Sequence, residues 1–296
     1  MSSAVLITGC STGIGRATAE RLAKNPELTV FASARNLDSI ADLADTGARL
    51  VQLDTTDEPS MVKAVDAIEA EFGAVGALVN NAGYGEYGSI EEVPMDKVRR
   101  EFETNVFGLS RLIQLVLPAM RAAGEGRIVN VSSMGGRLTF PMGGYYHASK
   151  YAVEAISDAL RFEVAPYGIK VTLIEPGITS TEFGHVASSS LSTASNDDGS
   201  PYEALGTAVD DQMEDAYKSK LMSTGPDTVA KAIEKAVTSS RPRPRAVITP
   251  LAKVLVHTRR LLGTRVWDMN MGLQYRSHKA VDSTPDGSEA EPKVSA

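Results

Sequence analysis

The sequence predicts a single α/β domain built on a doubly wound, seven-stranded parallel sheet with helices on both faces. Three observations lead to this prediction. Seven short runs rich in β-branched residues alternate with longer segments of helical period. Several of these runs are apolar on both faces, as strands of a covered parallel sheet are. The chain has 296 residues, of which 43% are hydrophobic, which suits one large domain of this kind.

The predicted elements follow one another in strict alternation. The strands are expected at residues 4–9, 29–34, 48–54, 76–83, 126–133, 169–177 and 245–250. The helices between them are expected at 14–24, 37–45, 59–72, 95–122 and 145–167. Pro59 follows two acidic residues, as a proline in the first turn of a helix does. Such alternation favours right-handed crossovers and one sheet.

Residues 1–250 are expected to form this domain, with an insertion and two further segments. The polar insertion, about 179–225, precedes the last strand and therefore falls at the carboxyl edge of the sheet, where ligands bind. We expect a flexible flap there, with a plain surface loop as the alternative. Residues 251–276 form a basic, partly amphipathic segment, and the composition of 277–296 predicts a disordered tail.

Composition excludes several classes of protein. A net charge of −7 argues against a general nucleic-acid binder. The single cysteine, Cys10, forbids an internal disulfide and favours a reducing compartment. The amino end shows no basic leader before an apolar core, and no run approaches about 20 consecutive apolar residues. The four histidines show no metal-ligand spacing. We expect a cytoplasmic protein with neither a metal site nor a nucleic-acid partner.

A glycine-rich turn follows the first strand and opens the first helix. It reads ITGCSTGIG (7–15), with glycines in a G-x3-G-x-G spacing. Glycines allow a tight turn and close backbone approach, and the free N–H groups of a helix N-terminus favour a phosphate. The placement predicts a Rossmann-type dinucleotide site, whose expected contacts here are Gly9, Ser11, Thr12, Gly13, Ile14 and Gly15.

The residue that ends the second strand indicates which dinucleotide binds. An acid there would hold the ribose 2′-hydroxyl of NAD, whereas an arginine accommodates the 2′-phosphate of NADP. Arg35 stands at this position, and its guanidinium suits a phosphate. Arg16 is a second candidate for that phosphate. Asp38 would favour NAD but lies beyond the strand. We expect NADP rather than NAD; a solvated surface arginine is the alternative.

Seven motifs in order give the chain a resemblance to a known family. They are TGCSTGIG (8–15), LDTTD (53–57), NNAG (80–83), ETNVFG (103–108), SSMGG (132–136), YHASK (146–150) and PGITST (176–181). Over about the first 180 residues the chain resembles the short-chain dehydrogenase/reductase family. The NNAGYG stretch and the missing strand-end acid look like its NADP-preferring branch of hydroxysteroid and retinol dehydrogenases. The resemblance implies hydride transfer between NADP(H) and a carbonyl or alcohol.

The resemblance implies a catalytic tetrad of Asn105, Ser133, Tyr146 and Lys150. Tyr146 would be the acid/base, and Asn105 would hold a water in a relay to Lys150. Physical reasoning agrees for the central pair, because residues four apart share one face of a helix. A nearby ammonium favours the ionised phenol. Lowering its pKa from about 10 to about 7 requires about 4 kcal/mol, which we expect from a close lysine together with a cationic nicotinamide in a dry pocket. A Tyr–Lys pair on a solvated helix, and Asn105 as core filler, are the alternatives.

The resemblance also assigns further cofactor contacts. Ser133, and not Ser132, should face the reaction, because neighbouring residues of a strand point to opposite faces. Backbone approach is expected at NNAG, adenine contacts after the third strand, and carboxamide contacts after the sixth. The residues concerned are Asn81, Ala82, Gly83, Asp54, Thr55, Pro176, Gly177, Ile178 and Thr181.

Aromatic and methionine residues near these motifs suggest a lipophilic substrate of steroid, retinoid or long-chain lipid type. Besides Ser133 and Tyr146, the expected substrate contacts are Tyr84, Leu138, Phe140, Met142 and Phe183, with Tyr87, Met213 and Met222 as further candidates. Ordinary core packing is the alternative for several of them. A catalytically silent NADP sensor is the alternative function, although such a protein would be expected to lose a tetrad member.

Residues 241–265 carry seven basic residues and no acid, with a partial apolar stripe. The segment is interpreted as a helix that lids the pocket, as a subunit contact, or as a face that lies on an anionic membrane. A stripe this short would bind a membrane weakly by itself. The family's habit of pairing its fourth and fifth helices implies a homodimer or homotetramer.

Overall fold

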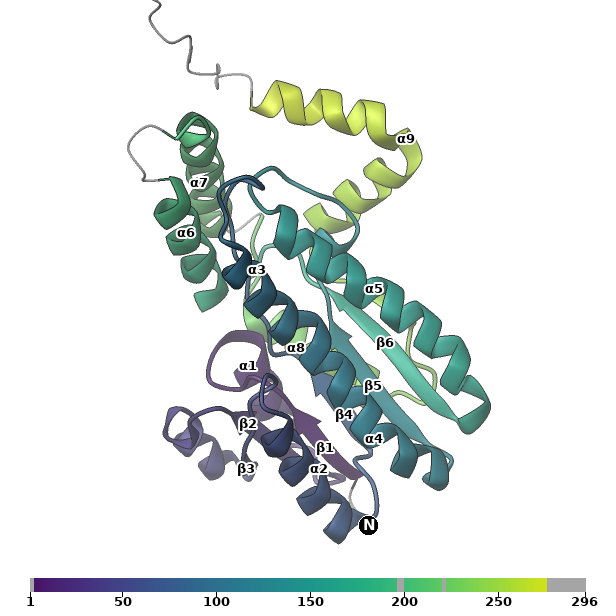
Figure 1. The fold of residues 1–296 in the computed structure, drawn as a ribbon. Helices are drawn as coiled ribbons and strands as arrows, with labels where there is room; N and C mark the ends of the chain where they lie inside the picture. Colours follow the sequence, from purple (N-terminus) through teal and green to yellow (C-terminus); the bar gives the residue numbers. More distant parts are fainter. Residues whose placement is uncertain (1–2, 196–199, 220–221, 276–296) are drawn as a thin grey trace, which may run out of the picture.

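A computed structural model describes residues 3–195, 200–219 and 222–275, and they form the expected sheet (Figure 1). Its order is β3-β2-β1-β4-β5-β6-β7, and every pairing is parallel. The strands are β1 (Ser3–Ile7), β2 (Leu28–Ala34), β3 (Arg49–Gln52), β4 (Ala77–Asn80), β5 (Gly126–Val131), β6 (Ile169–Glu175) and β7 (Arg245–Val247). The predicted doubly wound fold is confirmed. The predicted tail, 277–296, lies outside the described residues.

The helices depart from the predicted set in three ways. The stretch 37–45 is a 3₁₀ helix, 95–122 is interrupted by a π-helix, and α6 and α8 were not anticipated. The helices are α1 (Gly13–Leu22), η1 (Leu37–Thr46), α2 (Glu58–Phe72), α3 (Met95–Phe102), η2 (Glu103–Gly108), α4 (Leu109–Ala123), η3 (Met134–Gly136), α5 (Gly144–Val164), η4 (Ala165–Tyr167), α6 (Glu182–Ser195), α7 (Glu203–Lys218), α8 (Pro226–Thr238) and α9 (Pro250–Gln274).

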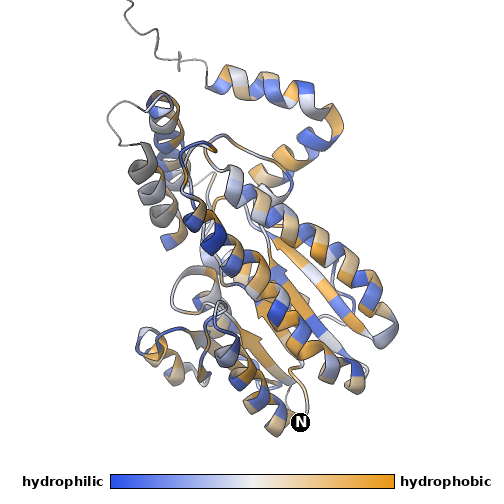
Figure 2. Ribbon diagram, in the orientation of Figure 1, coloured by the Kyte–Doolittle hydropathy of each residue, from blue (hydrophilic) through white to orange (hydrophobic). Residues whose placement is uncertain are grey.

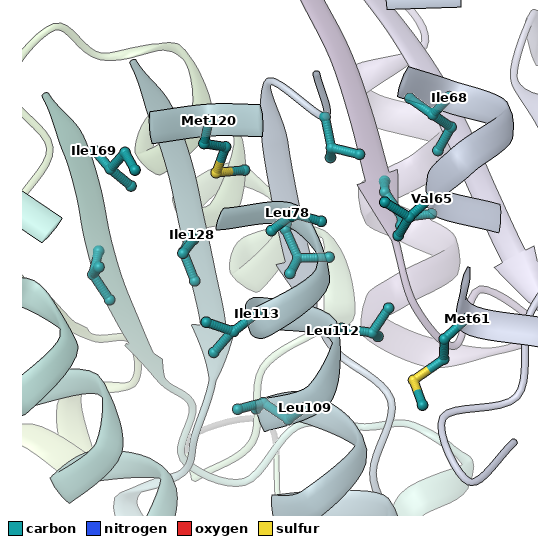
Figure 3. Close-up of a cluster of buried hydrophobic side chains, with 14 of the residues drawn as sticks. Met61, Val65, Ile68, Leu78, Leu109, Leu112, Ile113, Met120, Ile128 and Ile169 are labelled. Atoms are coloured by element: carbon teal, nitrogen blue, oxygen red, sulfur yellow. The ribbon is translucent and has the colours of Figure 1, made fainter. Parts of the chain in front are cut away.

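Two apolar layers hold the helices against the sheet. One joins α2, α4 and α5 to the strands. Figure 3 labels ten of its residues: Met61, Val65, Ile68, Leu78, Leu109, Leu112, Ile113, Met120, Ile128 and Ile169. The other joins α1, η1 and α8 to the opposite face through residues such as Leu22, Ile40 and Ile233. Burying one large aliphatic side chain contributes about 1.5–3 kcal/mol. The strands are therefore the most hydrophobic part of the molecule (Figure 2).

The π-helix η2 lies where α4 packs against the loop after β3. A Cβ on Gly108 would lie 2.1 Å from the carbonyl oxygen of Thr55, so only glycine permits this approach. Single π turns inside α-helices are frequent at functional sites. The stretch Met95–Ala123 is also long and apolar enough, by length and composition, to cross a membrane. Here its inner face is buried against the sheet, with Leu112 and Met120 fully enclosed.

Helices α6, α7 and α9 stand at the carboxyl edge of the sheet (Figure 1). The described part of the insertion (about residues 179–225) is mostly helical and is not a plain loop. Helices α6 and α7 form there and pack against each other. Helix α9 is broken at Gly263, which has φ 72° and ψ −173°. These elements complete the walls of the site described next.

Candidate functional site

A cavity of about 1330 Å³ opens at the carboxyl edge of the sheet. The loops that follow β1, β2, β4, β5 and β6 form its floor, and α7 and α9 form part of its walls. The predicted residues that line it are Gly9, Ser11, Thr12, Gly13, Ile14, Arg35, Asp54, Thr55, Asn81, Ala82, Gly83, Tyr84, Ser133, Phe140, Tyr146, Lys150, Pro176, Gly177, Ile178, Thr181 and Phe183. Gly15, Asn105, Leu138 and Met142 do not line it.

The glycine turn has the backbone that a bound phosphate requires. Gly9 and Gly13 have φ values of 70° and 57°, a conformation that favours glycine. A Cβ on Gly15 would lie 2.2 Å from the carbonyl oxygen of Gly9 and 2.4 Å from Nδ2 of Asn81. Gly15 therefore permits close helix packing and is not itself exposed to a ligand. The turn fits a dinucleotide pyrophosphate at the start of α1.

The loop after β4 is tied to this turn by hydrogen bonds. Asn81 Nδ2 donates to the carbonyl oxygens of Thr8 (2.9 Å) and Gly9 (3.1 Å). The backbone N–H groups of Asn81 and Ala82 both donate to Oγ1 of Thr8, at 3.0 Å. NNAG and the glycine turn therefore form one rigid unit, which presents its backbone to the cavity as expected.

The charged residues near the end of β2 differ in whether they line the cavity. Arg35 is exposed, lines the cavity and makes no ion pair within the described part of the chain. Arg16 instead pairs with Glu20 (3.2 Å) and Asp42, and it does not line the cavity, so its role at the phosphate stays a prediction that this geometry does not favour. Asp38 lies in the first turn of η1, capped by Asn36, and also stays outside the cavity.

Tyr146 and Lys150 lie together on α5, as their spacing predicts. Both are buried, and Lys150 Nζ lies 5.9 Å from the centre of the Tyr146 ring. The ammonium also donates to the carbonyl oxygen of Val131, at 3.1 Å. Tyr145 points elsewhere, and its hydroxyl donates to the carbonyl oxygen of Ile90 at 3.1 Å. Only one tyrosine of this segment therefore shares the lysine's face.

Ser132 and Ser133, which follow β5, point to opposite sides, as neighbouring residues of a strand do. The Ser133 hydroxyl is close enough to hydrogen-bond Tyr146, and it accepts the N–H of Gly135 at 3.0 Å. Ser132 lies on the other side: a Cβ on Gly136 would lie 2.8 Å from Ser132 Oγ and 2.9 Å from a side-chain carbon of Glu154. The structure therefore brings Ser133, Tyr146 and Lys150 together at the cavity.

Asn105 lies behind the cavity wall, in the π-helix η2. Its Nδ2 donates to the carbonyl oxygen of Tyr84 (2.8 Å) and to Ser149 Oγ (3.0 Å), and its Oδ1 accepts the N–H of Tyr84 (3.1 Å). Its side chain thus fixes the NNAGYG loop. Its Oδ1 also approaches Lys150, since both atoms lie within 3.4 Å of the position a Cβ on Gly83 would occupy.

Burial dominates the electrostatics of this site. Burial raises the pKa of Tyr146 above its ordinary value of 10, and the hydrogen bond with Ser133 opposes the rise. Burial also lowers the pKa of Lys150 from 10.5 to about 8, against the carboxylates of Glu101 and Glu154. Without a cofactor, burial therefore outweighs the nearby lysine. The expected lowering of the phenol pKa depends on a cationic nicotinamide in addition to Lys150, and this combination stays a prediction.

The structure adds one acidic residue that the sequence did not single out. Glu101, on α3, is fully buried, and burial raises its pKa to about 7. One carboxylate oxygen accepts the N–H of Glu86 at 3.0 Å, and the other has no hydrogen-bond partner among the described residues. The signal in the sequence that could have identified Glu101 is its position one helical turn before Asn105.

His147 is a buried, neutral histidine that braces the loop between Ser133 and Tyr146. Its Nδ1–H donates to the carbonyl oxygen of Gly135 (3.1 Å), and its Nε2 accepts the N–H of Phe140 (3.2 Å). Burial lowers its pKa from 6.5 to about 4. An imidazole with both nitrogens bonded in this way has no capacity for a proton.

This histidine predicts a pH-dependent stability. Because the folded pKa lies below the ordinary one, the unfolded chain takes up the proton first, and stability falls as pH drops from about 6.5 towards about 4. At pH 5 the loss is about 2 kcal/mol. Urea denaturation at pH 7 and pH 5 should show this extra loss in the wild type and not in His147→Gln. Equal losses in the two proteins would contradict the assignment.

Aromatic and sulfur-containing side chains surround Tyr146. Phe183 lies 5.3 Å from its ring and Tyr87 5.7 Å, between ring centres. The predicted contacts Tyr84, Phe140, Phe183, Tyr87, Met213 and Met222 all line the cavity. Leu138 and Met142 do not, because Leu138 packs under Val256 and Trp267 and Met142 packs behind Tyr87.

Part of the cavity wall was missed from the sequence. Tyr217 from α7 lines the cavity, and its ring packs on Gly184, where a Cβ would lie 2.8 Å away. Helix α9 supplies Leu251, Leu255, Asn270, Met271 and Gln274, followed by Tyr275. This arrangement agrees with the interpretation of the segment as a helix that lids the pocket.

The fold and site define a nucleotide-dependent oxidoreductase, and comparison with known proteins specifies it further. Residues 3–191 match the family model described as short chain dehydrogenase. The chain belongs to the short-chain dehydrogenase/reductase family, whose members act on CH–OH groups with NAD(P).

Three relatives illustrate the likeness. The chain is 34% identical over 251 residues to a 3-ketodihydrosphingosine reductase of Bacteroides thetaiotaomicron, covering 85% of this chain and 89% of that one. It is 38% identical over 257 residues to an NADPH-dependent 3-dehydrocapnine reductase of Ornithobacterium rhinotracheale, covering 83% and 87%. A short-chain dehydrogenase structure from Streptomyces avermitilis superposes with a TM-score of 0.75 at 31% identity, covering 94% and 98%.

Proposed function

We propose that this protein is a cytoplasmic, NADPH-dependent reductase of lipophilic carbonyl compounds, of long-chain lipid, steroid or retinoid type. The observation that carries the proposal is the meeting of Ser133, Tyr146 and Lys150 at one point of the cavity. On one side lies the glycine turn, which fits a dinucleotide. On the other lies a wall of aromatic and methionine side chains, which suits an apolar ligand.

The chain's own residues would orient and polarise the substrate. The cofactor supplies the hydride. Ser133 holds the carbonyl oxygen, and Tyr146 donates its phenolic proton to that oxygen as the alcohol forms. Lys150 stabilises the resulting phenolate. In the oxidative direction the phenolate accepts the proton. The buried walls exclude water, which strengthens these interactions.

The names of two relatives favour the long-chain class within this range. One reduces 3-ketodihydrosphingosine, which is a long-chain lipid, and another is an NADPH-dependent reductase. The apolar residues that α7 and α9 contribute to the cavity wall agree with such a substrate. A steroid or retinoid substrate of the hydroxysteroid and retinol dehydrogenase type is also proposed, because the same aromatic wall would suit it.

A substrate screen tests the proposed activity directly. NADPH oxidation is followed by absorbance with long-chain 3-keto lipids, steroid ketones and retinal, and short sugars serve as the negative control. Turnover of at least one lipophilic carbonyl is expected. Tight NADPH binding without turnover of any carbonyl would instead support the alternative of an NADP sensor, which the assembled catalytic residues disfavour.

NADP preference is proposed from Arg35. Arg35→Ala should weaken NADPH binding by about 10- to 100-fold, since charge-assisted hydrogen bonds to the 2′-phosphate are lost, while NADH binding stays unchanged. Arg16→Ala is the matched control, because Arg16 is held by Glu20 and Asp42 outside the cavity. Fluorescence titration measures both. An equal effect of Arg35→Ala on NADH would refute the assignment.

We also propose a homodimer or homotetramer. Phe107, Phe162 and Tyr167 lie on η2, α5 and η4, with exposed fractions of 56%, 79% and 46%. Large exposed aromatics on neighbouring helices are typical of an interaction surface. Size-exclusion chromatography with light scattering should give at least twice the chain mass.

A further inference from the structure

A second pocket, of about 330 Å³, lies between α5 and α9, and the proposed reaction does not use it. Among the residues that the structure describes, no acidic side chain lines it. Its lining residues are Arg137, Tyr151, Val256, Arg259, Arg260 and Gly263. Three of these six carry a guanidinium group, which matches the geometry of a phosphate.

Two of the three arginines are free to bind a ligand. Arg259 and Arg260 form no ion pair with any described residue, and Arg259 only donates to Oγ1 of Thr264, at 3.1 Å. Arg137 shares its charge with the buried carboxylate of Glu175, at 3.3 Å. Burial raises the pKa of Tyr151, and the charges of Arg259 and Arg137 oppose that rise, so these groups face the same space.

The bend of α9 beside this pocket exposes apolar side chains. Leu261 and Leu262, directly before the break at Gly263, have exposed fractions of 79% and 54%. Figure 1 shows the two arms of α9 meeting at a bend that stands away from the sheet. Arg265 follows the break, and residues 241–267 contain no acid. In Figure 2 apolar and polar residues alternate along this helix.

We propose that the bend of α9 docks this protein on a bilayer of anionic phospholipid. Arg259 and Arg260 bind the phosphate of a headgroup in the arginine pocket, and Leu261 and Leu262 insert between the headgroups. A helix with exposed apolar residues flanked by cations binds an anionic interface in this way.

Charge and shape together favour a membrane over other occupants. A free phosphate would account for the arginines but not for the two exposed leucines. A second copy of a chain with net charge −7 would need a surface both acidic and apolar at this point. The other side of α9 lines the large cavity through Leu255 and Met271, so a lipophilic substrate leaving the bilayer meets the cavity beside the docking surface. Docking itself does not depend on the proposed activity.

Vesicle co-sedimentation of the full chain tests this inference. Binding to phosphatidylserine/phosphatidylcholine vesicles is expected to exceed binding to pure phosphatidylcholine vesicles by at least about tenfold and to fall with added salt. Arg259→Ala/Arg260→Ala and Leu261→Ser/Leu262→Ser should each reduce it by at least about tenfold. Arg241→Ala/Arg243→Ala is the matched control, because it removes the same charge from the loop before β7. That loop lies at the amino end of β7, whereas α9 follows its carboxyl end, so vesicle binding should persist.

Three results would overturn the proposal. The first is unchanged vesicle binding by Arg259→Ala/Arg260→Ala. The second is binding of inorganic phosphate by calorimetry without any co-sedimentation, which would indicate a site for a free phosphate. The third is a smaller oligomer for Leu261→Ser/Leu262→Ser with unchanged vesicle binding, which would make the bend a subunit contact. None of these readouts requires turnover, so failure of the proposed reaction is recognised separately by NADPH oxidation.

Discussion

Tyr146→Phe is expected to lower turnover by about 10²- to 10⁴-fold and to leave NADPH affinity unchanged. The Tyr146 phenol lies at the cavity with the Lys150 ammonium 5.9 Å from its ring centre, so it can exchange a proton with the substrate oxygen, while the Ser133 hydroxyl holds that oxygen. Phenylalanine keeps the ring contacts with Tyr87 and Phe183. NADPH oxidation gives the turnover number, and fluorescence titration gives the affinity.

Tyr145→Phe is the matched control for this prediction. It removes the same group from the adjacent residue, where the hydroxyl only bonds the carbonyl oxygen of Ile90. Turnover should stay within about twofold of the wild type, because a surface hydrogen bond contributes little to the transition state. Wild-type turnover by Tyr146→Phe would show that another group transfers the proton.

Gly15→Ala is expected to destabilise the fold by about 3 kcal/mol and to abolish NADPH binding. The new Cβ would lie 2.2 Å from the carbonyl oxygen of Gly9 and 2.4 Å from Nδ2 of Asn81. Backbone cannot yield as a flexible side chain does, so α1 must move away from the turn. The hydrogen bond from Asn81 to Gly9 is then lost, and the phosphate site opens. Thermal unfolding and fluorescence titration measure the two effects.

Gly272→Ala tests whether the loss comes from the close approach. Gly272 also lies in a helix, and a Cβ there meets nothing within 4 Å. Alanine should stabilise it slightly, by about 0.5–1 kcal/mol, through its better helix propensity. A Gly15→Ala variant as stable as the wild type would show that the turn adapts, and the rigid cradle inferred here would be wrong.

The sequence predicted the parallel sheet and the shared helix face of Tyr146 and Lys150 because both depend on local patterns. Apolar runs of the right length and a Tyr–Lys spacing of four are readable without tertiary structure. Local patterns do not show which buried side chain faces a cavity. Leu138 and Phe140 are equally apolar, but Leu138 is buried beneath Trp267, whereas Phe140 lines the cavity.

The strength of the electrostatic effects was not predictable for a related reason. The spacing of Tyr146 and Lys150 showed that they are neighbours, but not how strongly burial acts against both charges. Glu101 was overlooked because a single glutamate in a charged helix looks like surface. The π turn at Asn105 arises from contact with the loop after β3, which no local pattern encodes.

The position of α9 after the cofactor-binding residues affects biosynthesis. The predicted cofactor contacts all precede residue 182, whereas Leu255, Met271 and Tyr275 are translated later. A nascent chain that still holds α9 in the ribosomal tunnel can thus assemble its nucleotide groove while one wall of the substrate chamber is still missing. We expect a stop codon before Pro250 to preserve dinucleotide binding and to leave the substrate chamber open on the side of α9.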